Sequence, residues 1–363
     1  MSPPAPPPHG QRGFREIAVI RLSSLGDVVL TLPVVHALSR TFPEARITYW
    51  VKQEFADVVR HDPCVGHVRE LERDARRLED LVSMSAELEG CDLIVDLHDS
   101  LRSRVLTLRQ KGRVLRVKNQ RLLRSRWVHA RWSGPPRAPH ALERYALTVA
   151  PAGVRAEGVP RMVLSAEHEE WAAEWRETTL GAAPILGFCP AARHATKRWP
   201  EEHWLALHGS AVAAGFAVTA FSLPRERQQF PKLAAALAAG KGAWCVEPLA
   251  RQAALLGGLR AVVTGDTGLM HVAAARGARV VALFGSTSPV LGFSPAGEGH
   301  TVLCRNEPCQ PCTLHGREVC PKGHFRCMRE LRPDEVFAAV QRVAASDADG
   351  PGGATVAERP AAP

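Results

Sequence analysis

Long apolar runs are missing from this 363-residue sequence, so no segment is expected to cross a bilayer. The opening residues, MSPPAPPPHGQRG, also lack the apolar core of a secretory signal. We therefore expect a cytoplasmic protein that at most lies on the inner face of the cell membrane. Without an export signal, the nine cysteines are expected to be thiols or metal ligands rather than disulfides.

Two nucleotide-binding signatures are absent as well. The sequence contains neither G-x-G-x-x-G nor G-x-x-x-x-G-K-[ST], so hydride transfer and kinase chemistry are poorly supported. A formal net charge of +9 and a pI near 9.4 indicate an anionic partner: nucleic acid, a membrane surface or a phosphorylated substrate. Because few aromatics interleave with the basic residues and no recognition motif is found, nucleic acid is not expected.

The hydrophobic pattern predicts an α/β protein with two Rossmann-like domains in series and a cleft between them. Strand-like runs alternate with helical stretches between residues 17 and 119, and the alternation restarts near residue 184. The expected domains span 15–160 and 161–345, with disordered tails at 1–14 and 346–363. The final helix, from Pro333, is expected to pack on the first domain. The expected strands are IAVIRL, RITYWV, HVREL, CDLIVDL and RVLRVKN, then PILGFCPAA, FAVTAFSL, GAWCVEPL, RAVVTGD and ARVVALFGS.

A turn near the start, RLSSLGDVVLTLP from Arg21 to Pro33, carries the first candidate site residue. The glycine lets the backbone turn, and Asp27 stands where a helix begins, so its carboxylate can cap free N–H groups. A carboxylate at the carboxyl end of a parallel strand can instead take a proton from a substrate, because open α/β sheets bind ligands at that edge. On these residues alone both interpretations stay open.

The second half contains a comparable turn in VVTGDTGLMHVAAARG. A strand is expected to end at Thr264 and to turn into a helix whose N–H groups and positive dipole end suit a phosphate. Asp266 can accept hydrogen bonds from sugar hydroxyls, Thr267 and Gly268 offer N–H donors, and His271 lies one turn into the helix. The alternative is an ordinary capped helix with a histidine in the core.

Two further loops of the second half carry candidate residues. In PAARHATKRWPEEHW, Lys197 follows Thr196 in a strand-to-helix loop, where a lysine can neutralise a diphosphate leaving group without a metal. In SLPRERQQF, Glu226 follows the next strand, a position where an acidic side chain often binds a ribose hydroxyl. A solvated surface charge explains either residue equally well.

Taken together, these segments resemble the ADP-heptose:lipopolysaccharide heptosyltransferases, a family of inverting glycosyltransferases with the GT-B architecture. The resemblance runs from Ile17 to the final helix. It rests on RLSSLGDVVLTLP, KRWPEEHW, GDTGLMHVAAARGARVVALFGSTSP and the cysteine-rich CQPCTLHGREVCPKGHFRCM.

The resemblance implies an ADP-L-glycero-D-manno-heptose donor bound by the second domain and a lipid A–Kdo acceptor bound by the first. Asp27 matches the general base of the family, and Lys197 matches its diphosphate-binding lysine. The remaining matches are the donor loop of Asp266, Thr267, Gly268 and His271, with Thr196 beside Lys197 and Glu226 as the ribose-binding acid. Catalysis is then expected to need no cofactor.

A basic stretch lies between Arg102 and Arg131. It is either a solvated helical face or a platform for acceptor phosphates and anionic lipid, with Arg102, Arg121 and Arg124 as the candidate acceptor-binding residues.

The segment CRNEPCQPCTLHGREVCPKGHFRC is rich in metal-ligand types. Cys309 and Cys312 have the spacing of a chelating pair, and Cys320 and Cys327 can complete a tetrahedral zinc or iron site. The alternative is a reduced cluster without metal. A bound metal is expected to be structural, because the other candidate residues lie elsewhere in the sequence.

Two other functions stay open at this point. The same fold can serve another nucleotide-sugar donor or another acceptor. Alternatively, the chain is a basic, metal-containing binding protein without catalysis, although the presence of Asp27, Lys197 and Asp266 argues against that function.

Overall fold

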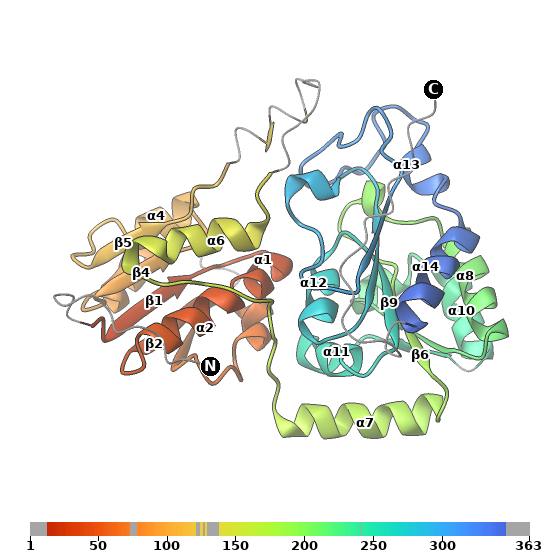
Figure 1. The fold of residues 1–363 in the computed structure, drawn as a ribbon, viewed down its shortest axis with the longest axis horizontal. Helices are drawn as coiled ribbons and strands as arrows, with labels where there is room; N and C mark the ends of the chain where they lie inside the picture. Colours follow the sequence, from red (N-terminus) through yellow and green to blue (C-terminus); the bar gives the residue numbers. More distant parts are fainter. Residues whose placement is uncertain are drawn as a thin grey trace. The chain divides into compact units, whose positions relative to one another are not determined.

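The computed structural model describes residues 13–72, 78–120, 124–125, 128, 138–240 and 242–345. The chain divides into two compact units (Figure 1). Unit 1 comprises residues 1–119 and 141–163, and unit 2 comprises residues 120–140 and 164–363. Within the described part of the chain, no helix combines the length and the apolar composition that a bilayer crossing demands.

Unit 1 is built on a five-stranded parallel sheet with the order β3-β2-β1-β4-β5. All five strands lie where the sequence predicts them. The strands are β1 (Glu16–Ile20), β2 (Arg46–Lys52), β3 (His67–Leu71), β4 (Leu93–Asp96) and β5 (Arg113–Arg116). The helical elements are α1 (Leu25–Leu30), α2 (Leu32–Thr41), η1 (Gln53–Val58), α3 (Leu78–Ser85), η2 (Ala86–Leu88), α4 (Leu101–Leu106), α6 (Ala141–Val149) and η3 (Ala150–Ala152).

Helices cover both faces of this sheet, which explains why β1 and β4 are apolar without alternation. Ala18, Ile20 and Ile94 pack in one core cluster with Leu81 of α3 and Leu106 of α4. Helices α1, α2 and α6 contact one another in a separate layer. The predicted helix over 28–42 is interrupted at Thr31, because α1 ends there and Pro33 occupies the first turn of α2.

Unit 2 is built on a six-stranded parallel sheet with the order β11-β10-β9-β6-β7-β8. The strands are β6 (Ile185–Cys189), β7 (Ala217–Phe221), β8 (Gly242–Cys245), β9 (Ala261–Gly265), β10 (Val280–Phe284) and β11 (Thr301–Cys304). The helical elements are α7 (Ala166–Leu180), η4 (Ala195–Lys197), α8 (Glu201–Ala213), α9 (Pro224–Arg227), α10 (Pro231–Ala239), α11 (Leu249–Leu256), α12 (Gly268–Ala275), η5 (Pro289–Leu291), α13 (Arg326–Arg329) and α14 (Pro333–Ala345). Only β11 was not predicted, because its four residues are bordered by polar and glycine-rich sequence.

The final helix, α14, packs on unit 2, so the prediction that it packs on the first domain is wrong. Its apolar face, with Val336, Val340 and Val343, joins the same core cluster as Phe188 of β6 and Leu283 of β10. This apolar face has a period of about 3.6 residues, and the sheet of unit 2 supplies the surface that buries it.

The boundary between the units differs from the predicted one in one segment. The predicted change from 160 to 161 lies close to the observed change from Val163 to Leu164, but residues 120–140 belong to unit 2. Ala138 explains part of this assignment, because its N–H donates to the Val290 carbonyl over 3.0 Å and its side chain packs on Leu291.

Two candidate sites at the edges of parallel sheets

The Asp27 carboxylate lies in the first turn of α1, just beyond the carboxyl end of β1. One oxygen, Oδ2, accepts hydrogen bonds from the Ser24 hydroxyl over 2.7 Å and from the Ser24 N–H over 3.3 Å. The other, Oδ1, lies 2.7 Å from the Arg21 guanidinium and accepts a hydrogen bond from the Tyr145 hydroxyl over 3.0 Å. Asp27 therefore caps its own helix, as one interpretation of the sequence required, and it is also fixed by two side chains outside that turn.

The charge of Asp27 follows from these neighbours. Burial raises the pKa of this carboxyl, but the Arg21 charge and the hydrogen bonds from Ser24 and Tyr145 outweigh burial, and the pKa falls to about 2. The side chain is still 17% exposed. The result is an ionised carboxylate of fixed orientation with part of its surface accessible.

The surroundings of Asp27 are buried and polar. Arg21 follows β1, donates to the Leu97 carbonyl, and lies 5.6 Å from the centre of the Tyr145 ring. His98 follows β4, and burial together with the Arg21 charge lowers the pKa of its imidazole to about 4. At neutral pH the edge of unit 1 thus presents a carboxylate, a guanidinium paired with it, and a neutral imidazole.

Unit 2 has a second site at the carboxyl ends of β6, β9 and β10. The η4 turn passes so close to two of these strand ends that both carry glycine. A Cβ on Gly265 would lie 2.8 Å from the Lys197 carbonyl oxygen, and a Cβ on Gly285 would lie 2.7 Å from that of Thr196. These glycines allow the backbone of η4 to rest on the sheet edge.

Lys197 and Asp266 meet at this edge although 68 positions separate them in the sequence. The ammonium of Lys197 lies 2.7 Å from Oδ2 of Asp266, which also accepts a hydrogen bond from the Thr287 hydroxyl over 2.7 Å. Burial raises the pKa of Asp266, but the Lys197 charge and these hydrogen bonds outweigh it, so the pKa lies below its usual value. The two groups therefore form a charged pair, about 15% exposed on each side.

The helix that follows Asp266 begins as the sequence predicts. Thr267 is the N-cap residue of α12 and makes no capping hydrogen bond through its side chain, and Gly268 is the first residue of the helix. His271 is buried one turn further on, and its charge interaction lowers the pKa of Asp266. The N–H groups of the first turn remain available to an anion.

Two predicted donor-site residues have other partners in the structure. The Thr196 hydroxyl is buried, lies 2.9 Å from the Ser286 hydroxyl, and accepts a hydrogen bond from the Arg317 N–H over 2.8 Å. The Glu226 carboxylate follows β7 at the same sheet edge, but it accepts a hydrogen bond from the Leu223 N–H over 2.9 Å and so caps α9. Thr196 thus supports the loop that carries Lys197.

The described acceptor-binding candidates belong to different units. Arg102 is half-buried in α4 of unit 1. Arg124 belongs to unit 2, where its guanidinium lies 5.4 Å from the centre of the Phe293 ring. Arg121 lies outside the described residues.

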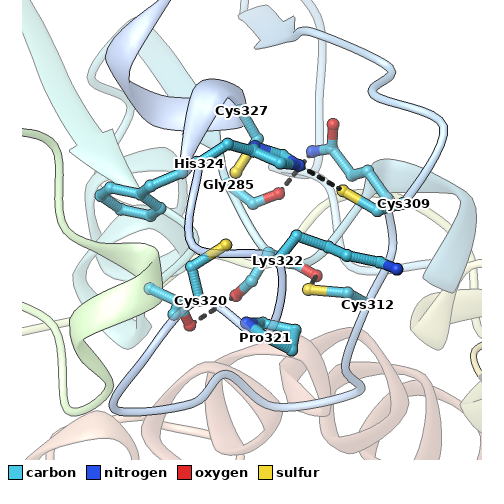
Figure 2. Close-up of a pocket in the computed structure, with 12 residues that line it drawn as sticks. Gly285, Cys309, Cys312, Cys320, Pro321, Lys322, His324 and Cys327 are labelled. Carbon is cyan, nitrogen blue, oxygen red and sulfur yellow. Dashed lines mark hydrogen bonds between the residues drawn. The ribbon is translucent and has the colours of Figure 1, made fainter.

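The four predicted metal-binding cysteines line one pocket of unit 2 (Figure 2). Cys309, Cys312, Cys320 and Cys327 are all free thiols. The potential ligand atoms that lie within 4.8 Å of one another at this pocket belong to Cys309, His324 and Glu307, and Nε2 of His324 lies 3.7 Å from the Cys309 sulfur. Burial, together with the charges of the neighbouring cysteines, raises the pKa of Cys327 to about 12. Thiols of this kind lose their protons when a metal ion binds.

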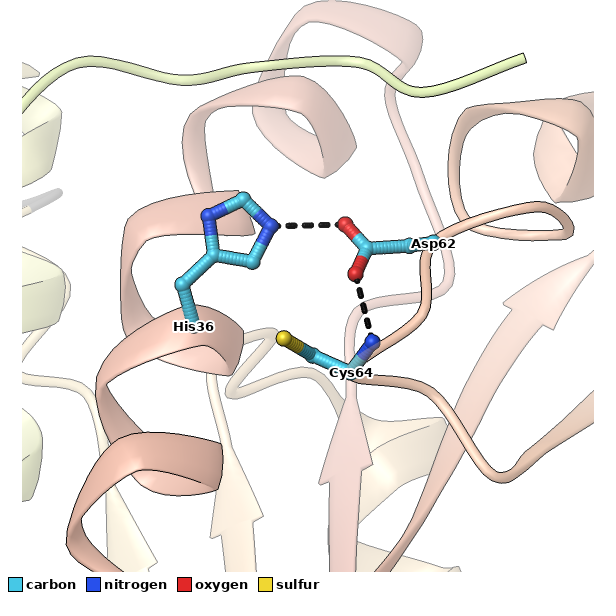
Figure 3. Close-up of side chains that lie close together, drawn as sticks. All are labelled: His36, Asp62 and Cys64. Carbon is cyan, nitrogen blue, oxygen red and sulfur yellow. Dashed lines mark hydrogen bonds and ion pairs between the residues drawn. The ribbon is translucent and has the colours of Figure 1, made fainter.

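A second group of metal-ligand types, in unit 1, was not predicted (Figure 3). Nε2 of His36 lies 2.7 Å from Oδ2 of Asp62, and Oδ1 of Asp62 accepts a hydrogen bond from the Cys64 N–H over 2.9 Å. The Asp62 carboxylate is fully buried and both its oxygens are satisfied. This group therefore connects the loop before β3 to α2 without any ligand.

Sequence reasoning missed several residues that define the two sites. Arg21 could have been found, since a cation directly after a buried strand lies at the ligand-binding edge of a parallel sheet. Tyr145 and Thr287 had no local signal. They reach Asp27 and Asp266 from elements 118 and 21 positions away.

A family model described as glycosyltransferase family 9 (heptosyltransferase) matches residues 82–321. The chain is 29% identical over 355 residues to lipopolysaccharide heptosyltransferase 1 of Pseudomonas aeruginosa, covering 88% of this chain and 92% of that relative. It is 37% identical over 118 residues to lipopolysaccharide heptosyltransferase 2 of Salmonella typhimurium, covering 31% of this chain and 33% of that relative.

Solved structures share the fold. A family 9 glycosyl transferase from Veillonella parvula superposes with a TM-score of 0.77 at 19% identity, over 93% of this chain and 99% of that one. Escherichia coli heptosyltransferase WaaC with ADP superposes with a TM-score of 0.65 at 20% identity, over 90% of this chain and 99% of that one. The iron-containing dodecameric glycosyltransferase TibC of enterotoxigenic E. coli superposes with a TM-score of 0.55 at 14% identity, over 92% of this chain and 77% of that one. The predicted α/β fold class with two parallel sheets is thereby confirmed.

Proposed function

Because this chain belongs to glycosyltransferase family 9, the heptosyltransferase family, we propose that it transfers heptose from ADP-L-glycero-D-manno-heptose to the inner core of lipopolysaccharide with inversion. The two relatives named above are lipopolysaccharide heptosyltransferases. Structures of WaaC with ADP and with ADP-2-deoxy-2-fluoro heptose indicate the donor class. The observation that carries the proposal is the oriented, ionised and partly exposed carboxylate of Asp27.

Asp27 is proposed as the group that receives the proton of the acceptor hydroxyl. The acceptor oxygen forms a bond to the anomeric carbon while the bond from that carbon to the phosphate oxygen of ADP breaks. Four donors already occupy the carboxylate, and the Ser24 hydroxyl is the one that can rotate away to admit a substrate hydroxyl. A carboxylate with so low a pKa takes the proton only once the attacking oxygen has become acidic, late in bond formation.

Lys197 and the start of α12 are proposed to stabilise the departing ADP. The ammonium and the N–H groups of Thr267 and Gly268 can receive the diphosphate charge, so this step needs no divalent ion. Asp266 then holds Lys197 in place and accepts hydrogen bonds from the donor's hydroxyls. Glu226 lies at the same edge and is proposed to contact the ribose. To do so, its carboxylate gives up the hydrogen bond from the Leu223 N–H that caps α9.

The acceptor and the membrane surface are proposed to meet the basic stretch between Arg102 and Arg131. The net charge of +9 and the density of Arg and Lys in this stretch support an anionic partner. A lipid A–Kdo acceptor carries phosphates and carboxylates and is anchored in the cytoplasmic face of the inner membrane, which gives the protein a peripheral location.

The cysteine-rich segment is proposed to hold one structural zinc or iron ion on Cys309, Cys312, Cys320 and Cys327. Four thiolates in a tetrahedral set suit either metal, and the cavity that the four residues line is of suitable size for one ion. A related fold that contains iron is consistent with this proposal.

The decisive test is a reaction of the purified chain with ADP-heptose and a lipid A–Kdo acceptor, followed by ADP release and by NMR of the new anomeric linkage. We expect ADP release that depends on the acceptor, and an inverted linkage. In a thermal-shift screen, ADP should stabilise the protein while UDP and GDP do not. Equal stabilisation by all three would support another donor, and no response to any would favour a binding protein without catalysis.

Lys197→Met tests the assignment of the leaving-group site. We expect ADP to bind roughly tenfold more weakly or worse, because one charge-assisted contact is worth about 1.5–3 kcal/mol. Lys232→Met is the matched control, since Lys232 is exposed on α10 of the same unit. An unchanged ADP affinity in a folded Lys197→Met protein would remove Lys197 from the donor site.

A further inference from the structure

The cysteine-rich segment is hydrogen-bonded to the loop after β10, whose Thr287 hydroxyl donates to the Asp266 carboxylate. The Gln310 amide donates to the carbonyls of Phe284 and Thr287 over 3.1 and 2.9 Å. The Cys312 N–H donates to the Ser286 carbonyl over 3.0 Å. The segment and the loop after β10 are therefore connected by backbone and side-chain hydrogen bonds at consecutive residues.

A second connection runs from the same segment to the loop that carries Lys197. The Arg317 N–H donates to the Thr196 hydroxyl over 2.8 Å, and the Thr196 N–H donates to the Arg317 carbonyl over 3.0 Å. Arg317 lies between Cys312 and Cys320 in the sequence, just as Gln310 lies between Cys309 and Cys312. Each contact to the donor site is thus flanked by two of the four cysteines.

The segment is also held by an ion pair between Glu307 and Arg326 and by a contact of 3.2 Å between His194 and Glu318. Between β11, which ends at Cys304, and α13, which begins at Arg326, the described chain forms only turns and bends. A loop of this length without regular structure depends on cross-links for a fixed conformation. Four thiols that bind one metal ion would add such a cross-link at four positions of the segment.

The cavity that the thiols help to line has room for one ion. The cavity has a volume of about 10 Å³, close to what one water molecule needs. Figure 2 shows Cys309, Cys312, Cys320 and Cys327 around it, with His324 beside Cys309 and Lys322 at the side. Lys322 supplies positive charge next to a set of thiolates that would carry a net negative charge with a divalent ion.

We propose that the metal ion held by these four cysteines controls donor affinity, because it fixes the segment whose Gln310 holds the loop of Thr287 after β10 and whose Arg317 holds the loop of Thr196 and Lys197. This inference rests on the proposed ADP-sugar donor and on the proposed metal site. Without the ion, Gln310 no longer restrains the Thr287 loop, and the Thr287 hydroxyl that orients Asp266 moves with it. In the sequence the cysteines lie apart from Asp266 and Lys197, whereas in the structure Gln310 contacts the Thr287 residue that donates to Asp266, and Arg317 contacts the Thr196 residue that precedes Lys197.

The first experiment measures metal content and ADP binding on the purified full-length protein. Elemental analysis should find about one zinc or iron per chain. Removal of the metal by a chelator under reducing conditions should weaken ADP binding, measured by calorimetry, by about tenfold. Because coupling between two ligands is reciprocal, ADP should strengthen metal binding by the same factor.

The second experiment distinguishes the effect of losing the Gln310 hydrogen bonds from the effect of losing the metal ion. Gln310→Ala leaves all four cysteines in place, so we expect a full metal content, a nearly unchanged melting temperature and ADP binding weakened several-fold. Cys309→Ser with Cys312→Ser should lose the metal and show the same defect in ADP binding. Cys91→Ser is the matched control, because Cys91 belongs to unit 1 and does not line the cavity, so neither property should change.

Each contrary result has a distinct meaning. A fully active protein that contains no metal overturns the inference. If metal is present but its removal leaves ADP affinity unchanged, the ion is structural only and the coupling is wrong. If the metal-loaded protein does not bind ADP at all, the proposed donor fails, and the metal assignment is judged from elemental analysis alone.

Discussion

The Asp27 carboxylate has to satisfy two demands with two oxygens. Through Oδ2 it caps α1, and through Oδ1 it neutralises Arg21, which is only 8% exposed. An amide can meet the first demand but not the second. An asparagine at position 27 therefore keeps helix capping but removes both the charge pair with Arg21 and the ability to accept a proton.

Asp27→Asn is expected to lower kcat by roughly 10²–10⁴-fold, the usual effect of losing a general base. It is also expected to lower the free energy of unfolding by about 3 kcal/mol, because Arg21 keeps a buried charge without its partner. Urea unfolding and kcat per folded molecule measure the two effects. Asp57→Asn is the control, since Asp57 pairs with Arg60 in a more exposed position.

The role of Asp27 as the proton acceptor would be abandoned if Asp27→Asn kept a kcat within a few-fold of the wild type where chemistry limits the rate. ADP affinity should be the same in both proteins, because the donor residues belong to unit 2.

The low pKa of Asp27 predicts where pH affects stability. The folded pKa of about 2 lies below the reference value of 3.8, so the folded state binds this proton more weakly than the unfolded state does. The resulting stabilisation, about 2 kcal/mol, is complete above pH 3.8 and is lost as pH falls through 2.

Unfolding of wild type and Asp27→Asn, followed from pH 6 to pH 2, tests this directly. The stability difference between the two proteins should shrink by about 2 kcal/mol towards the acid end. A constant difference would mean that Asp27 is not ionised as described. Above pH 4 the Asp27 carboxylate should stay ionised. The pH profile of kcat/KM should therefore have the same titration steps in the wild type and in Asp27→Asn.

At the scale of elements, both candidate sites use the same construction. A parallel strand ends, the chain turns tightly, and a helix begins with polar groups directed to the sheet edge. In unit 1 this is β1 followed by α1, and in unit 2 it is β9 followed by α12. Parallel strands align their carboxyl ends, so residues from adjacent turns come together at one edge.

Glu201 shows how one helix fixes the start of another in unit 2. Its Oε1 accepts hydrogen bonds from the N–H groups of Lys232 and Leu233 over 2.7 and 3.0 Å, which caps α10 from another helix. Glu201→Ala is expected to lower the free energy of unfolding by about 1 kcal/mol, the usual loss for an N-terminal cap.

Glu202→Ala is the matched control for this change, because Glu202 is the exposed neighbour in the same helical turn. Denaturant unfolding should place it within about 0.5 kcal/mol of the wild type. Equal effects of the two substitutions would show that the bonds to α10 contribute nothing measurable.

At the scale of the whole molecule, the excess of positive charge predicts contact with an anionic surface. Arg121→Gln with Arg126→Gln should weaken binding to anionic liposomes at low salt and raise the apparent KM for the acceptor, since each charge near such a surface contributes about 1 kcal/mol. Arg155→Gln with Arg161→Gln removes the same charge from exposed positions elsewhere.

Liposome flotation at low and high salt, with acceptor kinetics, distinguishes the two double variants. Donor affinity should stay constant in both. If both pairs weaken liposome binding equally, net charge alone is responsible, and the basic stretch is no more than a solvated surface.

The structure changed the sequence-based description most where a residue's partner is distant. Lys197 and Asp266 were singled out separately, but nothing in either loop predicts that they pair. Thr196 was expected to face the donor, yet Arg317, 121 positions away, engages its hydroxyl. The order of the strands and the turns after them had local signals, whereas the partner of a polar group had none.

The sequence by itself determined the two parallel sheets, the turns at Asp27 and Asp266, and the cysteine spacing, because hydrophobic periodicity and turn residues act over a few neighbouring positions. Only the tertiary structure decided that Arg21 and Tyr145 fix Asp27, that α14 covers the sheet of unit 2, and that the cysteine-rich segment contacts the loops of Thr196 and Thr287. Those contacts join residues tens to more than a hundred positions apart, and such contacts exist only after strands have paired and helices have packed.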